Sequence, residues 1–275
     1  MTLSTEALPR SPLQGFASRA IDIMATDGRF IGLLAGGSAI TGSTDEYSDL
    51  DLILVVRDDA YADVLTCRRG FAETLGDLLY AFTGEHVGEP RLLICLYGNP
   101  LLHVDLKFVT LGDLDQRVEN PIILWDYEGT IAARLSQGSA CWPSKDPEWF
   151  EERFWVWVHY AATKLGRGEL FEVIDMLAFL RGQVLGPLAM RRVGADQRGV
   201  RRLEAIAPHT ATSMAGTIGN HSGKACAMAL RNAIRLYMDL REDSPPVNRH
   251  PEKEAEVLAY VEAIIDHTLG DRVPA

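Results

Sequence analysis

The sequence predicts an α+β fold, with a small mixed-sheet lobe over residues 1–142 and an α-helical bundle lobe over residues 143–275. Short apolar runs bounded by Gly and Asp occur before residue 142, a pattern typical of buried strands. Long amphipathic segments with helix-start signals follow residue 143. Between the two patterns, Ser136–Ser139 and Pro143 mark a turn-rich boundary.

The N-terminal lobe combines helix and strand patterns. Residues 1–13 carry two prolines and little periodicity, so we expect a loosely ordered lead-in. Further along, two runs on either side of Gly98-Asn99-Pro100 predict a hairpin. The expected elements are, in order, helix 16–26, strands 30–35 and 49–56, helix 60–82, strands 91–97 and 101–109, and strand 121–127.

Four helices are expected in the C-terminal lobe. Asp146-Pro147-Glu148 combines a capping residue, a first-turn proline and an acid at the positive end of the helix dipole. Gly182 and Gly186-Pro187 predict a kink or break in the second helix. The expected helices cover residues 146–165, 169–192, 223–241 and 251–269, and their antiparallel packing would form a bundle.

Composition and charge narrow the class of protein. With 275 residues, 47% of them hydrophobic and 24% charged, the chain can bury a substantial core as a soluble globular protein. The formal net charge is −11, from 38 acidic and 27 basic residues. Proteins that bind nucleic acids neutralise phosphates with clustered Lys and Arg, so this balance argues against a polynucleotide substrate. It is compatible with a cationic small molecule.

The cysteines and apolar segments indicate the compartment. Cys67, Cys95, Cys141 and Cys226 are scattered without metal-ligand spacing, and Cys95 is expected in the core. The N-terminus shows no long apolar segment behind a basic start, and no window approaches about 18 uninterrupted apolar residues. We therefore expect a cytoplasmic protein with no membrane partner.

The stretch 33–56 contains the strongest chemical pattern. An apolar run ends at Gly36-Gly37-Ser38, and a second apolar run begins with Asp49-Leu50-Asp51. On a strand, Asp49 and Asp51 project from the same face, and paired carboxylates on a half-buried strand call for a cation such as Mg²⁺. Side-chain-free backbone at the Gly-Gly-Ser turn would let a phosphate approach closely.

Gly37-Ser38, ten intervening residues and Asp49-Leu50-Asp51 resemble the signature of the nucleotidyltransferase superfamily of the DNA polymerase β type. Gly42, Asp45 and Tyr47-Ser48 make the stretch similar to the aminoglycoside and lincosamide nucleotidyltransferases in particular. The resemblance implies that Asp49 and Asp51 hold Mg²⁺ and that Gly37 and Ser38 hold the phosphates of ATP or another nucleoside triphosphate. The alternative is a strand-capping Ser-Asp pair beside an ordinary glycine turn.

Asp105 is the candidate third acid. In strand 101–109, Val104, Leu106 and Phe108 face one way, and His103, Asp105 and Lys107 face the other. The resemblance places a third acidic residue on a neighbouring strand, where it would share the metal or accept the proton of the attacking hydroxyl. The alternative is an exposed edge-strand aspartate paired with Lys107 or His103.

Residues 154–165 of the expected helix 146–165 carry the candidates of the second lobe. Tyr160 and Lys164 are one turn apart and share a face. The resemblance implies that Lys164 reaches the nucleotide phosphates, and that His159 stands where the kanamycin-modifying branch has a glutamate base. A solvated lysine and a packed histidine are the alternatives. The general base therefore remains open between Asp105, His159, and Glu169 or Glu172.

Together these patterns predict an active site in a cleft between the two lobes. The reaction would be Mg²⁺-dependent transfer of a nucleoside monophosphate, AMP from ATP, onto a hydroxyl of a hydroxyl-rich, cationic small molecule, with aminoglycoside-type antibiotics as candidates. Glu169, Glu172 and Asp175 are acids that could meet such an acceptor. Two alternatives stay open: a nucleotidyltransferase acting on a protein or RNA partner, as in toxin–antitoxin pairs, and a catalytically silent nucleotide-binding relative.

Overall fold

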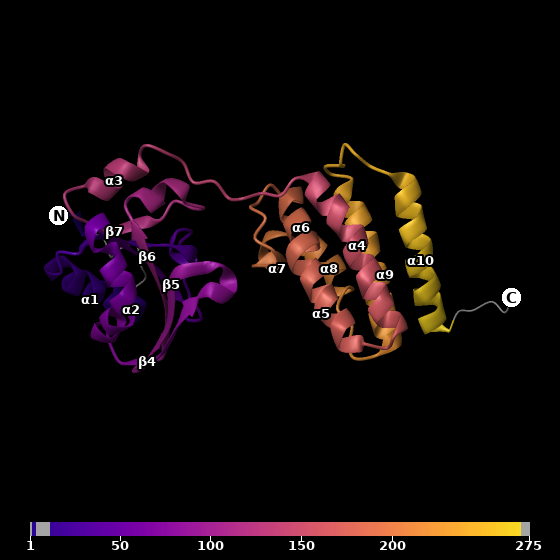
Figure 1. The fold of residues 1–275 in the computed structure, drawn as a ribbon, viewed down its shortest axis with the longest axis horizontal. Coiled ribbons are helices and arrows are strands. Elements are labelled where there is room, and N and C mark those ends of the chain that lie inside the picture. The colour runs from indigo at the N-terminus through magenta and orange to yellow at the C-terminus, as the bar shows by residue number, and fades with distance from the viewer. Residues whose placement is uncertain (1, 4–11, 271–275) are drawn as a thin grey trace. The chain divides into compact units, whose positions relative to one another are not determined.

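The computed structural model describes residues 2–3 and 12–270, with side chains described from residue 12 onward. The chain divides into two compact units, residues 1–142 and residues 143–275, each with its own hydrophobic core (Figure 1). The predicted α+β class is confirmed, because a mixed β-sheet forms the centre of the first unit and helices form the second.

In the described part of the first unit, seven strands form one sheet in the order β1-β7-β2-β3-β6-β5-β4. The strands β3 and β6 are parallel to each other, and all other neighbouring pairs are antiparallel, so the sheet is mixed as predicted. The strands are β1 (Thr2–Leu3), β2 (Phe30–Ala35), β3 (Leu50–Val56), β4 (Leu78–Gly84), β5 (Glu89–Tyr97), β6 (Leu102–Thr110) and β7 (Ile122–Asp126).

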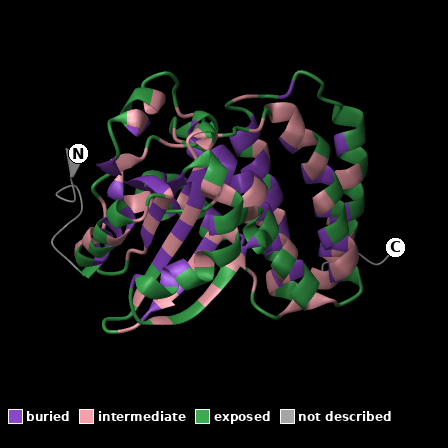
Figure 2. Cartoon of the chain, turned by 60° about the vertical axis from the view of Figure 1, so that its left-hand side comes forward, coloured by how far each residue is buried: buried purple, intermediate pink, exposed green. Residues whose placement is uncertain are grey.

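Two hydrophobic clusters cover the two faces of this sheet to different extents. The larger cluster packs helices α1 (Pro12–Thr26) and α2 (Tyr61–Thr74) against one face, and it includes Cys95, as expected. The smaller cluster joins Val55 and Val109 to Ile131 of helix α3 (Thr130–Leu135) on the other face. Alternating buried and intermediate residues along the strands are visible in Figure 2. We call the face that carries the smaller cluster the second face.

The predicted helix 60–82 is wrong in its second half. Helix α2 ends at Thr74, and Leu78–Gly84 form strand β4, which pairs with β5 at the edge of the sheet. Gly76 and Asp77 interrupt the helical pattern, and Tyr80, Phe82 and Thr83 favour a strand. Pairing with β5 thus outweighs the helical spacing that Leu78 and Leu79 share with the preceding apolar residues.

The structure confirms the predicted hairpin but describes only part of the predicted lead-in. Of the lead-in predicted for residues 1–13, Thr2–Leu3 form β1 and Pro12 begins α1, while residues 4–11 lie outside the described residues. The hairpin is confirmed as β5 and β6, with Val104, Leu106 and Phe108 buried on the face of the larger cluster.

The second unit contains the four predicted helices. Helix α4 begins where expected, because the Asp146 carboxylate accepts a hydrogen bond of 2.7 Å from the Trp149 backbone N–H. The predicted break appears as a π-helical turn, Arg181–Leu185, between α5 and α6. Helices α7 and α8 were not predicted. The helices are α4 (Pro147–Gly166), α5 (Leu170–Leu180), α6 (Gly186–Arg192), α7 (Leu203–Ile206), α8 (Pro208–Ala215), α9 (Gly223–Arg241) and α10 (Pro251–Leu269).

Among the described residues, one helical stretch, Leu170–Arg192, is long and apolar enough to cross a membrane by length and composition. It runs through α5, the π-helical turn and α6, and Val173, Leu177, Leu180 and Val184 are fully buried in the core of this unit. These core contacts account for its apolar composition.

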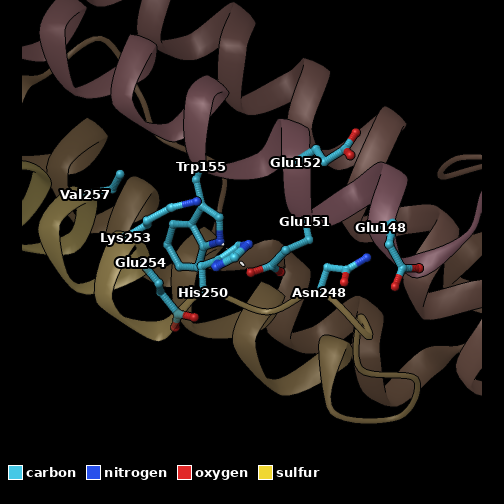
Figure 3. Close-up of a pocket in the computed structure, with 9 residues that line it drawn as sticks. All are labelled: Glu148, Glu151, Glu152, Trp155, Asn248, His250, Lys253, Glu254 and Val257. Carbon is cyan, nitrogen blue, oxygen red and sulfur yellow. Dashed lines mark hydrogen bonds between the residues drawn. The ribbon is translucent and has the colours of Figure 1, made fainter.

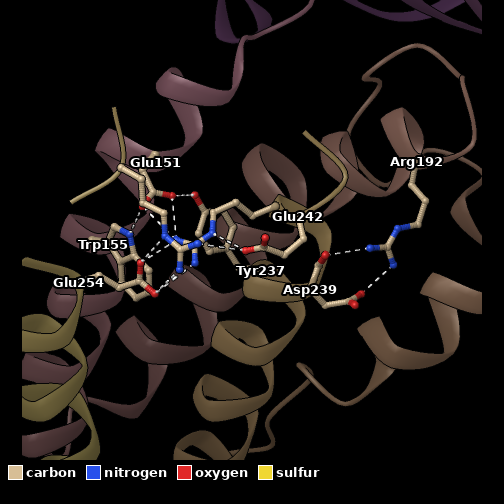
Figure 4. Close-up of polar contacts among 9 residues, drawn as sticks. Glu151, Trp155, Arg192, Tyr237, Asp239, Glu242 and Glu254 are labelled. Carbon is tan, nitrogen blue, oxygen red and sulfur yellow. Dashed lines mark hydrogen bonds and ion pairs between the residues drawn. The ribbon is translucent and has the colours of Figure 1, made fainter. Parts of the chain in front are cut away.

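A buried ionic network joins α4, α9 and α10 (Figure 4). The Arg241 side chain is 2% exposed, and its Nη1 lies 3.0 Å from both Glu151 Oε1 and Glu254 Oε2. The Tyr237 hydroxyl and the Trp155 indole N–H donate to Glu151 at 2.5 and 2.9 Å. Burial opposes ionisation of Glu254, yet the bonds from Arg241 hold its pKa below the ordinary value. The network therefore keeps the Glu254 carboxylate charged and pairs both glutamates with Arg241 inside the unit.

Candidate active site

Two of the predicted acids lie side by side at the centre of the sheet. Strands β3 and β6 run parallel, and Asp51 is directly opposite Asp105. Directly opposite residues share a face of a sheet, so both carboxylates project from the second face. Asp49 immediately precedes β3, and all three acids are partly exposed. The structure therefore brings Asp51 and Asp105 together as an acid pair, with Asp49 at the residue before β3 rather than on the strand as predicted.

The surroundings of Asp105 perturb its pKa. Burial raises the pKa of Asp105 above its ordinary value; the nearby His103 opposes the rise, and the charge of Asp49 adds to it. His103 Nε2 lies 3.1 Å from Asp105 Oδ1, whereas Lys107 binds Glu89 at 2.7 Å. Because β6 lies between β3 and β5, the edge-strand alternative for Asp105 is wrong, although its pairing with His103 is present.

Gly37 brings the glycine turn against these acids. The short 3₁₀ helix η2 (Gly37–Ala39) follows β2, and Gly37 has a φ of +59°, a left-handed conformation that favours glycine. A Cβ atom at Gly37 would lie 1.8 Å from Asp51 Oδ2, so a larger residue here would force the Asp51 carboxylate to move. The turn and the acid that the sequence placed 14 positions apart are thus in direct contact.

Glu119 is a site residue that the sequence did not indicate. Its Oε1 accepts a hydrogen bond of 2.9 Å from the Gly37 backbone N–H, the group expected to face a phosphate. Glu119 lies 82 positions away in the loop before β7, where neither periodicity nor a motif singles it out. A carboxylate therefore lies where the resemblance places a phosphate oxygen.

The loop between Ser38 and Asp49 is held by its own polar groups. Ser38 Oγ lies 3.2 Å from Thr44 Oγ1, and the Ser38 carbonyl accepts from the Ser43 N–H at 3.1 Å. Asp45 Oδ1 accepts from Ser48 Oγ at 2.9 Å. These bonds fix Ser38 beside Gly37 at one end of the loop and Asp49 at the other.

A cavity of about 800 Å³ opens beside this loop, within the first unit. Its walls come from the loop, from the turn between β5 and β6, and from the start of α1, and they include Asp45, Tyr47, Asp49 and His103. The volume suits a small molecule of drug size.

The donors at this site suit a hard divalent cation. Asp51 and Asp105 offer adjacent carboxylate oxygens, which are the ligands that Mg²⁺ prefers, and Asp49 is close enough to influence Asp105. Across residues 12–270, no set of three or more His, Cys, Asp and Glu side chains converges tightly enough to hold a metal without rearrangement. By donor chemistry, the acid pair fits a metal that recruits its remaining ligands from water and phosphate.

The second unit brings together Lys164, Tyr160, Glu169 and Glu172. Lys164 Nζ donates to Glu169 Oε2 at 2.6 Å and lies 3.9 Å from Glu172 Oε2, and the Tyr160 hydroxyl donates to Glu172 at 2.8 Å. The bond to Glu169 raises the pKa of Lys164 above its ordinary value. Lys164 is thus a paired cation with a side chain 17% exposed, rather than a freely solvated one.

His159 lies apart from this group. The exposed His159 ring stacks on Tyr260 of α10 with the centroids 4.7 Å apart. Tyr160 and Lys164 instead bind Glu172 and Glu169, which lie at the start of α5. The structure agrees with the packed-histidine alternative for His159.

A second cavity, of about 270 Å³, lies between α4 and the start of α10 (Figure 3). Glutamates and Trp155 line it, but Glu151 and Glu254 are bound to Arg241, and Glu148 accepts from the Val247 N–H. Glu148, Glu151 and Glu254 therefore serve the fold of the unit.

Comparisons with known proteins give matches to solved structures, among them the following two. An aminoglycoside 6-adenyltransferase from Bacillus subtilis is 15% identical, with a TM-score of 0.33, over 95% of this chain and 98% of that one. A nucleotidyltransferase-like protein from Exiguobacterium sibiricum is 12% identical, with a TM-score of 0.35, over 95% of this chain and 92% of that one. No protein-family model and no curated protein matches the sequence.

Proposed function

We propose that the protein is a Mg²⁺-dependent nucleotidyltransferase that moves a nucleoside monophosphate, AMP from ATP, onto a hydroxyl of a small molecule. One observation carries the proposal: Asp51 lies opposite Asp105 and in contact with Gly37. A phosphate-binding turn and a metal-binding acid pair at one point are the parts that phosphoryl transfer needs.

The position of each site residue indicates its role in the proposed reaction. Bound Mg²⁺, held by Asp49, Asp51 and Asp105, would neutralise charge on the triphosphate. The Gly37 N–H and the Ser38 hydroxyl donate to the phosphates that leave. The acceptor oxygen attacks the α-phosphorus, the bond to the bridging oxygen breaks, and pyrophosphate departs. Asp105 lies opposite Asp51, where it would share the metal or accept the proton of the acceptor hydroxyl.

Lys164 is proposed to add positive charge to the triphosphate. Lys164→Ala should weaken ATP binding by about 10- to 100-fold, since a charge-assisted contact contributes about 1.5–3 kcal/mol. The KM of the acceptor should stay unchanged. Steady-state kinetics measure both values, with Lys224→Ala on α9 as the exposed control. An unchanged KM for ATP in the Lys164→Ala variant would show that Lys164 has only the structural role of pairing with Glu169.

Glu119 competes with phosphate for the Gly37 N–H in this proposal. Glu119→Gln keeps an acceptor oxygen but removes a negative charge, so ATP should bind about 5- to 30-fold more tightly, a gain of about 1–2 kcal/mol. Calorimetric titration with Mg·ATP measures this, and titration with tripolyphosphate repeats it without metal. Glu128→Gln is the matched control, since Glu128 is exposed on the loop after β7. Weaker binding only when Mg²⁺ is present would identify Glu119 as a metal ligand.

The acceptor is proposed to be hydroxyl-rich and cationic, with an aminoglycoside-type antibiotic as a candidate, and the compartment to be the cytoplasm. The net charge of −11 supports a cationic acceptor. Glu169 and Glu172 already bind Lys164 and Tyr160, so they could meet an acceptor amine only by giving up these bonds.

Pyrophosphate release tests the function. The protein, ATP and Mg²⁺ are incubated with kanamycin, lincomycin, methyl glucoside or a short RNA, with Asp51→Asn as the inactive control. Release with kanamycin or lincomycin supports the proposal, and release with RNA alone favours the polynucleotide-directed alternative. Absence of both release and ATP binding would contradict the proposal.

A further inference from the structure

The second face of the sheet continues past the acids as an apolar surface. On β5, Ile94 lies directly opposite Asp105, and on β4, Phe82 lies directly opposite Ile94. With Asp51 opposite Asp105, these four side chains form one row across four strands. A parallel row joins His103, Leu96 and Tyr80. We call Ile94, Leu96, Tyr80 and Phe82 the aromatic strip.

The aromatic strip is unusually exposed for apolar side chains in a sheet. Tyr80 is 71% exposed and Phe82 is 55% exposed, and Ile94 and Leu96 are partly exposed. On the opposite face of β5, Leu93 and Cys95 are 3% and 1% exposed in the larger cluster. The helix α3 and the smaller cluster cover the second face at Val55 and Val109, which lie four residues beyond Asp51 and Asp105. At the strip, the His86 ring of the short 3₁₀ helix η4 (Glu85–Val87) lies against Phe82 with the centroids 5.5 Å apart, and Phe82 still remains 55% exposed.

The strand order relates the strip to the proposed reaction. Gly37 follows β2, the acids lie on β3 and β6, and the strip lies on β5 and β4, so the three sites follow one another across the sheet. In-line displacement at phosphorus places the attacking oxygen opposite the leaving group. If pyrophosphate leaves at Gly37, the acceptor hydroxyl approaches from the side of Ile94 and Phe82.

We propose that the aromatic strip binds the acceptor through an apolar ring face, an inference that rests on the proposed function. With strands about 4.8 Å apart, Phe82 lies about 10 Å across the sheet from Asp105, a span that one or two sugar-sized rings cover. Aromatic side chains stack on flat ring faces and also attract ammonium groups. The acceptor class is therefore a hydroxylated molecule with a flat, largely apolar ring face, charged or neutral.

The test compares acceptor and nucleotide kinetics in strip variants. Tyr80→Ala and Phe82→Ala should each raise the KM of the acceptor about tenfold, because each removes one stacking surface, and should leave the KM of ATP unchanged. Tyr80→Phe and Phe82→Tyr should retain wild-type values. Tyr127→Ala is the control, since Tyr127 is a 44% exposed aromatic residue just past the end of β7. Kanamycin, lincomycin and methyl glucoside are the acceptors, and thermal unfolding confirms that each variant is folded.

Each outcome separates the inference from the proposed function. Pyrophosphate release by the wild type with unchanged acceptor KM in both alanine variants overturns the strip and leaves the function standing. Equal rises in both KM values also overturn it, because the strip would then act on the whole site. Loss of a dimer in sedimentation velocity, with unchanged kinetics, would assign the strip to a second copy of the chain. Absence of release from the wild type overturns the function and the strip together.

Discussion

Asp51→Asn is expected to lower turnover by about 100- to 1,000-fold while leaving the protein as stable as the wild type or more so. The substitution removes a charge that the transferred phosphate and its metal need, and losses of that size follow removal of one electrostatic group from an active site. Asn has nearly the same volume, so it fits against Gly37 as Asp does. Removing one of two opposed carboxylates also relieves their repulsion in the nucleotide-free protein.

Two measurements on the same variant check this expectation. Pyrophosphate release gives the turnover, and urea unfolding gives the free energy of unfolding. Asp59→Asn, at an exposed acid outside the site, is the matched control for loss of one charge. Turnover near the wild-type rate in Asp51→Asn would refute the assignment of the metal-binding acids. A large loss of stability would show that Asp51 serves the fold.

Arg241→Met is expected to destabilise the second unit by about 3–5 kcal/mol, the usual result of removing one partner of a buried ion pair. Arg241 is 2% exposed, and its loss leaves Glu151 without its guanidinium partner and Glu254 with only the more exposed Arg249. Urea unfolding at pH 7 measures the effect. The triple variant with Glu151→Gln and Glu254→Gln should recover part of the stability, because no buried charge then remains unpaired.

The same network predicts that the free energy of unfolding depends differently on pH in the wild type and in the Arg241→Met variant. In the wild type, the pKa of Glu254 is lowered from 4.5, so its contribution is present above pH 4.5 and is lost as the pH falls through the lower folded value. Without Arg241, burial of Glu254 is opposed only by Arg249, so protonation of Glu254 destabilises the variant less than it destabilises the wild type. The difference in unfolding free energy between the wild type and Arg241→Met should therefore shrink as the pH falls from 7 to 4. A constant difference would show that Arg241 acts by packing alone.

The parts of the fold that local patterns specify were predicted from sequence. Strand 30–35 is confirmed at both ends, and Asp146 caps α4 as the sequence indicates, since each depends on neighbouring residues. Strand β4 was missed because Leu78 and Leu79 continue the spacing of α2, and only pairing with β5 decides between helix and strand. Helices α7 and α8 are short and have weak start signals, so tertiary packing sets them.

The candidate site likewise combines residues whose placement the sequence predicts with residues whose placement depends on tertiary structure. The pairing of Asp51 with Asp105 could be expected because each acid interrupts an apolar strand, and charged groups in such positions call for a shared partner. The contact of Glu119 with Gly37 could not be expected from the sequence, because it depends on the path of a loop that has no periodic pattern. His159 was misleading, because its neighbours in sequence suggested chemistry while its ring stacks on Tyr260, 101 positions away.

The contact between Gly37 and Asp51 has a consequence for how this chain can change over time. Because a Cβ at position 37 would overlap Asp51 Oδ2, substitutions at the two positions are epistatic: no larger residue can enter at 37 while Asp51 keeps its place. Replacement of Asp51 by a smaller residue would remove this overlap. Asn, which tolerates the left-handed backbone at φ +59°, could then replace Gly37. The glycine at position 37 thus depends on the acid at position 51, and loss of the acid makes replacement of the glycine easier.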